Sequence, residues 1–123
     1  MEYIILAIVI GGLGYLYFFL TIRWGNLTQA RKQEFRSELE RASELDPEHA
    51  IIVVDRVLEQ ILSTLWGKRS LGENLQKHYQ NHPDSNELWK YHKIRNKLVH
   101  EGGVRVGRRD IEGFRNLIQR VFL

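Results

Sequence analysis

The chain opens with a long segment in which almost every position is apolar. No charged residue occurs from Tyr3 to Ile22, and about twenty residues at 1.5 Å each match a hydrocarbon core of roughly 30 Å. The start, Met1-Glu2, lacks the basic residues of a cleaved signal peptide, and the apolar run is longer than the core of such a peptide. A helix buried in a globular core is the other alternative, but such helices are rarely uncharged on every face. The pattern therefore predicts a single transmembrane helix over residues 1–24.

The charges that flank this segment predict its orientation. Glu2 stands alone before it, whereas Arg23, Arg31 and Lys32 follow it. Because positive charge stays on the cytoplasmic side, we expect the N-terminus outside and the remainder of the chain inside. The expected location is the cell membrane, with a single span and a cytoplasmic C-terminal domain.

Residues 25–45 mix apolar side chains at near-helical spacing with many charges. The apolar positions are Leu27, Ala30, Phe35, Leu39, Ala42 and Leu45. This spacing predicts a helix, and we interpret it as a stalk or linker that continues the first helix.

Two helix starts are marked by capping residues. Asp46 followed by Pro47 places a capping residue before a proline at the first helical position. The apolar face that follows continues to Gly67, where the helix is expected to end. Ser70 and Glu73 have the spacing of a capping box and predict a second, short helix.

Two more helices complete the predicted domain. One is expected from residue 87 to about residue 100, before two glycines, and the last begins near residue 108. No long segment alternates with the period of a strand. We therefore predict an all-α protein, in which the N-terminal transmembrane helix precedes a small four- to five-helix bundle over residues 46–123.

Positive charge is concentrated at the C-terminal end of the chain. From Lys90 onward there are nine Lys or Arg residues against three Asp or Glu residues. Such a surface suits an anionic partner such as RNA or lipid headgroups, and its alternative interpretation is a solvated basic face.

The helix expected to end near residue 100 carries an unusual set of polar side chains. On a helical wheel its core side is formed by Leu88, Tyr91, Ile94, Leu98 and Val99, and Arg95 falls in the middle of that arc. A guanidinium there needs a carboxylate or a cleft, and Asp55 or Glu59 on the preceding long helix could supply the carboxylate. His92, Asn96 and His100 form a column beside it at four-residue spacing.

The string Arg95-Asn96-Lys97-Leu98-Val99-His100 resembles the signature of the HEPN superfamily, in which an Arg and a polar residue precede a His. The wider run from Trp89 to Gly102 also resembles small membrane-anchored HEPN-like proteins of bacteria. The resemblance covers the chain from about Leu45 to its end.

The resemblance implies metal-independent cleavage of RNA by two paired domains. It implies that His100 moves a proton of the ribose 2′-hydroxyl or of the leaving oxygen, that Arg95 stabilises charge on the phosphate, and that Asn96 orients the pair. Imidazole and guanidinium groups suit these roles, because the first titrates near neutral pH and the second matches phosphate oxygens. The residues expected to contact the RNA are His92, Lys93, Lys97, Arg105, Arg108 and Arg109.

Other chemistries have no support in the sequence. The chain has no cysteine, the two helical histidines lie two turns apart without a third ligand, and no phosphate-binding glycine loop follows a strand. We therefore expect neither a metal nor a cofactor.

Two functions remain open at this point. The first is a membrane-tethered endoribonuclease that acts as a homodimer. The second is a non-catalytic HEPN-like module that binds RNA or a protein partner at the membrane, with Arg95 serving the core. Pairing of Arg95 with Asp55 or Glu59 inside one chain would favour the second.

Overall fold

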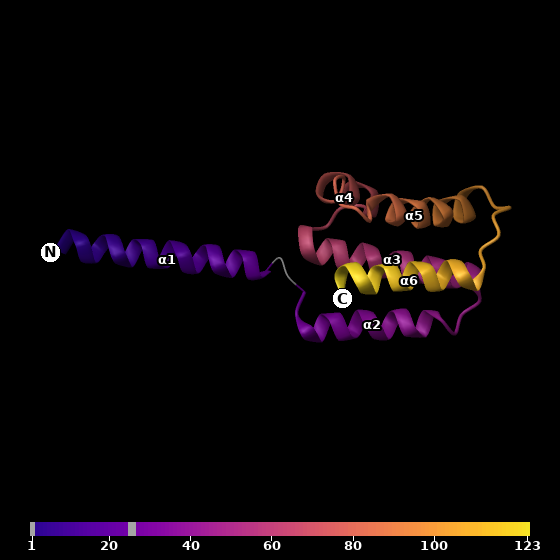
Figure 1. The fold of residues 1–123 in the computed structure, drawn as a ribbon, viewed down its shortest axis with the longest axis horizontal. Helices are drawn as coiled ribbons and strands as arrows, with labels where there is room; N and C mark the ends of the chain where they lie inside the picture. The colour runs from indigo at the N-terminus through magenta and orange to yellow at the C-terminus, as the bar shows by residue number, and fades with distance from the viewer. Residues whose placement is uncertain (1, 25–26) are drawn as a thin grey trace.

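The computed structural model describes the backbone of residues 2–24 and 27–123, and the side chains of residues 2–17 and 27–123. All the regular structure in these residues is α-helical (Figure 1). The helices are α1 (Glu2–Trp24), α2 (Gln29–Ala42), α3 (Pro47–Trp66), α4 (Leu71–His78), α5 (Ser85–His100) and α6 (Arg108–Phe122).

Helix α3 is the centre of a bundle formed by α2 to α6. It packs against α2, α4, α5 and α6 (Figure 1). Its buried side chains are Ala50, Ile51, Val54, Asp55, Val57, Leu58, Ile61 and Leu62. The predicted apolar face of α3 is therefore confirmed, and the other helices of the bundle cover it.

The predicted helix starts and stops are confirmed where local chemistry encodes them. Pro47 begins α3, and Gly67 ends it with φ at 102°, a left-handed conformation that favours glycine. At the start of α4, Ser70 Oγ accepts from the backbone N–H of Glu73 at 3.2 Å and donates to the Glu73 carboxylate at 3.1 Å.

Helix α2, which we expected to be a stalk, is part of the bundle. Phe35, Leu39 and Ala42 are completely or almost completely buried against α3. Arg36 donates to the backbone carbonyl of Leu123, and Arg108 donates to that of Ser43. The middle of α2 is thus hydrogen-bonded to the last residue of the chain, and the residue after α2 is hydrogen-bonded to the start of α6. The apolar stripe of α2 is buried against α3. The bundle begins at α2 and not at residue 46.

The prediction of a transmembrane helix is wrong. Within the described residues, no helix has both the length and the apolar character that crossing a membrane requires. This requirement is about twenty apolar residues in succession, because the hydrocarbon core of a bilayer is roughly 30 Å thick. The side chain of Arg23, used above for the orientation, and residues 25–26, at the predicted boundary, lie outside the described residues. Those α1 side chains that are described are exposed to solvent.

Helices α5 and α6 pack through one close aromatic contact. The rings of Tyr91 and Phe114 are stacked, with centroids 4.8 Å apart and an interplanar angle of 13°. Gly113 lies beneath the Tyr91 hydroxyl, and a Cβ atom at Gly113 would overlap that oxygen. The absence of a side chain at Gly113 therefore sets how closely α5 approaches α6.

Candidate functional site

A buried carboxylate on α3 organises the polar side chains of α5. Asp55 is only 2% exposed, and a buried charge is stable only when it is paired. His92 Nδ1 lies 3.1 Å from Oδ1 and 3.2 Å from Oδ2 of this carboxylate. Arg95 Nε lies 3.6 Å from Oδ2, a distance that suits an ion pair but exceeds a hydrogen bond. Both partners come from α5, so Asp55 also fixes α5 against α3.

The hydrogen bonds around Asp55 form a chain with one direction. Arg95 Nη1 donates to Asn96 Oδ1 at 3.0 Å, and the Asn96 amide nitrogen lies 3.3 Å from His92 Nε2. Because an amide nitrogen can only donate and a carboxylate can only accept, His92 accepts at Nε2 and donates from Nδ1. Hydrogen bonds therefore run from Arg95 Nη1 through Asn96 and His92 to Asp55, whereas the buried Nε of Arg95 has no hydrogen-bond partner and is paired with Asp55 by charge alone.

Arg95 is held in place without being enclosed. Its side chain is 30% exposed, whereas that of Asp55 is 3% exposed. The inner edge of the guanidinium faces the carboxylate, and the remaining surface reaches solvent. This is the pairing within one chain that favours the non-catalytic interpretation, and the carboxylate is Asp55; Glu59 is exposed.

His100 lies apart from this cluster. It is exposed in the last turn of α5 and makes no hydrogen bond or ion pair with the described part of the chain. It follows Arg95 by five positions, which corresponds to a rotation of about 140° around the helix axis. The two side chains therefore leave the helix in different directions, and they do not contact each other in the described structure.

The other residues predicted to contact RNA differ in accessibility. His92 faces inward, with 13% of its side chain exposed. Lys93 and Lys97 are exposed along α5, and Arg105, Arg108 and Arg109 are exposed near the start of α6. In Figure 1 the end of α5 and the start of α6 lie at the same end of the bundle. Positive charge thus extends from the middle of α5 to this end.

Sequence reasoning missed two features of the site. It considered Asp55 for Arg95 but not for His92, although His92 and Arg95 are one turn apart and a single carboxylate can reach both. It also missed Gln76, Gln80 and Asn86, which line a groove beside Trp89. No local signal marks these amides, because the groove exists only where α4 meets α5.

No group of three or more His, Asp or Glu side chains among the described residues could share a metal ion. No family model, curated protein or solved structure matches the chain.

Proposed function

We propose that this chain is a HEPN-like helical module that binds RNA along α5. The observation that carries the proposal is the Arg95 guanidinium, which Asp55 and Asn96 hold from inside while part of it stays exposed. A guanidinium held in this way loses little side-chain entropy when it binds a phosphate oxygen.

The surroundings of Arg95 support an anionic partner. Lys93 and Lys97 are exposed on the same helix, and neither is part of an ion pair in the described residues. Ammonium groups with no internal partner contribute more to phosphate binding than paired ones, because no existing interaction is lost. A protein partner with an acidic surface is the alternative ligand, and the experiment below separates the two.

A metal-independent endoribonuclease is the second candidate function. It is supported by the exposure of His100 and by the divergence of His100 and Arg95, which suits a site built from two chains. In such a homodimer the ribose 2′-oxygen would attack the adjacent phosphorus while the 5′-oxygen leaves. The products would be a 2′,3′-cyclic phosphate and a 5′-hydroxyl. His100 would take the 2′ proton or protonate the leaving oxygen, Arg95 would stabilise the phosphate charge, and Asn96 would orient Arg95.

We place binding ahead of cleavage because Arg95 is already paired with Asp55 inside one chain. Reorienting it toward a partner's His100 would leave a carboxylate buried without its cation, which is costly. Binding to the exposed part of the guanidinium requires no such change.

The test uses the full chain in mild non-ionic detergent, because α1 exposes apolar side chains. Binding of a fluorescein-labelled single-stranded 12-mer RNA is followed by anisotropy in EDTA at several salt concentrations. We expect binding that weakens with salt, and Lys97→Gln should lower the slope of log K against log salt by about 0.7. Lys68→Gln, an exposed lysine between α3 and α4, is the matched control. An RNA affinity that does not respond to Lys97→Gln would contradict binding along α5.

The same samples decide the second candidate. RNA that is cleaved by the parent chain, but not by His100→Ala, would make the protein a ribonuclease. RNA that stays intact at a concentration where sedimentation shows a dimer would leave binding as the function. Absence of RNA binding by the parent would overturn both proposals and favour a protein partner.

A further inference from the structure

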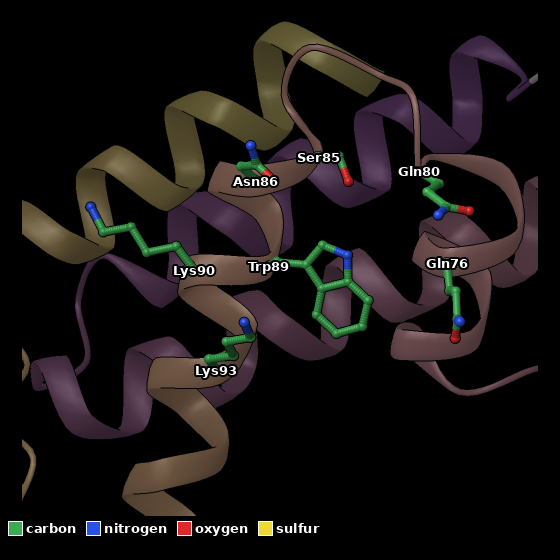
Figure 2. A pocket seen from close by; sticks show the side chains of 7 residues that line it. All are labelled: Gln76, Gln80, Ser85, Asn86, Trp89, Lys90 and Lys93. Atoms are coloured by element: carbon green, nitrogen blue, oxygen red, sulfur yellow. The ribbon is translucent and has the colours of Figure 1, made fainter.

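A broad groove lies between α4 and α5, separate from the Asp55 cluster. Its volume is about 790 Å³, within the range of pockets that hold small ligands. Figure 2 shows that the Trp89 indole lies between the α5 backbone and two glutamines, Gln76 of α4 and Gln80 just after it. The side chains that line this groove include Gln76, Gln80, Asn86, Trp89, Lys90 and Lys93.

Trp89 forms a fixed aromatic surface in this groove. Its indole is half-buried and packs over Gly72 of α4, where a Cβ atom would lie 3.4 Å from the ring. Its ring centroid is also 6.0 Å from that of His92, in an edge-to-face arrangement. Because His92 is held by Asp55, the indole is supported from two sides. A supported aromatic ring offers stacking area at little entropic cost.

The polar groups around Trp89 are amides without partners. Gln76, Gln80 and Asn86 are exposed, and none of their side-chain amides makes a hydrogen bond with the described residues. Each amide has both donors and an acceptor, which is the combination presented by the edge of a nucleobase. An aliphatic ligand would leave these amides unpaired, so the lining argues against an apolar peptide.

The charge of the groove is positive. Lys90 and Lys93 line it, and no acidic side chain does so among the described residues. Lys90 Nζ lies 5.2 Å from the centroid of the Tyr91 ring, whereas Lys93 has no such contact and is exposed. An aromatic surface, amides and an unpaired cation together match a base linked to a phosphate.

We infer that the α4–α5 groove is a nucleotide subsite for single-stranded RNA. One base stacks on Trp89, the amides of Gln76, Gln80 and Asn86 contact its edge, and Lys93 binds the adjoining phosphate. The inference rests on the proposed function and adds the substrate class, a single strand with an unpaired base. Trp89 and Lys97 are eight residues apart, about 12 Å along the helix, so a short strand reaches both the groove and the surface around Arg95.

The test compares a single-stranded 12-mer RNA with the same strand in which all bases are removed. The full chain is expected to bind the normal strand on the order of tenfold more tightly than the abasic strand, as one stacked base contributes. In Trp89→Ala this difference should disappear, and in Trp89→Phe most of it should remain. Lys93→Gln should lower the affinity for both strands by the same factor, and Lys68→Gln should change neither affinity.

Since Trp89 is half-buried, circular dichroism checks that Trp89→Ala is folded. If it is not, Gln76→Ala replaces it, because Gln76 is exposed and its loss should reduce the difference between the strands without affecting the fold. Equal affinity of the parent for the two strands overturns the subsite. If that affinity still responds to Lys97→Gln, binding along α5 stands.

A free nucleotide carries the same base and phosphate as one residue of an RNA strand, so it is the other ligand that fits this groove. Adenosine monophosphate is therefore titrated as a competitor of the RNA. Competition only at concentrations far above those of the strand supports a strand subsite. RNA bound no more tightly than the free nucleotide assigns the groove to nucleotides and overturns the strand inference.

Discussion

The imidazole of His92 and the carboxylate of Asp55 meet at 3.1 Å although 37 residues separate them in the chain. The two side chains join α5 to α3 at the level where Arg95 emerges. Their contact therefore links the stability of the bundle to the position of the guanidinium that we propose for RNA binding.

Replacing Asp55 should destabilise the bundle. Asp55→Ala removes the hydrogen-bond acceptor of His92 and the counter-ion of Arg95, and loss of one partner of a buried pair costs roughly 3 kcal/mol. Because Arg95 is 30% exposed, water offsets part of this, and we expect about 2 kcal/mol. Urea unfolding followed by circular dichroism measures the change. Glu59→Ala, one turn further along α3 and exposed, should alter the free energy of unfolding by less than about 0.5 kcal/mol.

His92 should carry its proton on Nδ1 when the ring is neutral. The Asn96 amide can donate to Nε2 only if that nitrogen has a free lone pair. Nitrogen-15 NMR of the imidazole distinguishes the two tautomers directly. Observation of the Nε2–H tautomer in the folded chain would mean that the direction of the hydrogen-bond chain derived above is reversed.

Gly113→Ala should destabilise the contact between α5 and α6. The new methyl group would overlap the Tyr91 hydroxyl, and forced repacking of this kind costs about 1–3 kcal/mol. Tyr91→Phe should rescue most of the loss, because the next nearest atom, Tyr91 Cζ, lies at an ordinary contact distance of 3.5 Å. A double-mutant cycle in urea gives the coupling. If Tyr91→Phe fails to restore stability, the hydroxyl is not the source of the clash.

The pH dependence of stability should contain a contribution from His78. Loss of solvation lowers the pKa of His78 below its ordinary value of 6.5, and the charges of Arg69 and Lys77 lower it further. The ring is stacked on Trp66 with centroids 4.8 Å apart, and Arg69 Nη1 lies 3.2 Å from its Nε2. Because the folded state favours the neutral imidazole, this shift contributes to the free energy of unfolding, and the contribution is complete at pH values above the pKa of His78 in the unfolded chain. This contribution is lost as the pH falls below 6.5.

We therefore expect His78→Gln to lose less stability than the parent when the pH is lowered from 7.5 to 5.5. Urea unfolding at the two pH values measures this, and proton NMR of the parent should give a His78 midpoint below 6.5. His49, exposed at the start of α3, provides the matched control in His49→Gln. An identical response of His78→Gln and the parent would contradict the shift.

The helices of the bundle were largely predictable because their signals are local. Pro47, Gly67 and the Ser70 cap act on their immediate neighbours, so the bounds of α3 and the start of α4 could be read from a few residues. The position of Arg95 on a core-facing arc was predictable for the same reason, since helical periodicity depends only on spacing.

The candidate site was only partly predictable. The sequence placed Arg95, Asn96 and His100 on one helix, and with the resemblance it indicated RNA. It did not indicate that His92 turns inward or that Asp55 binds two side chains of α5. Those facts depend on the rotation of α5 relative to α3, which packing across the core decides.

The sequence by itself determined that the chain is helical, where most helices begin and end, and that its last third is basic. Tertiary structure decided which apolar stripes find a partner. It drew α2 into the bundle, where a stalk was expected, and created the α4–α5 groove from side chains that no spacing connects. The transmembrane prediction was wrong for a similar reason, because it inferred from apolar composition alone that the first helix lies in a bilayer. Periodicity and caps act between neighbours along the chain, whereas burial depends on surfaces that meet only after folding.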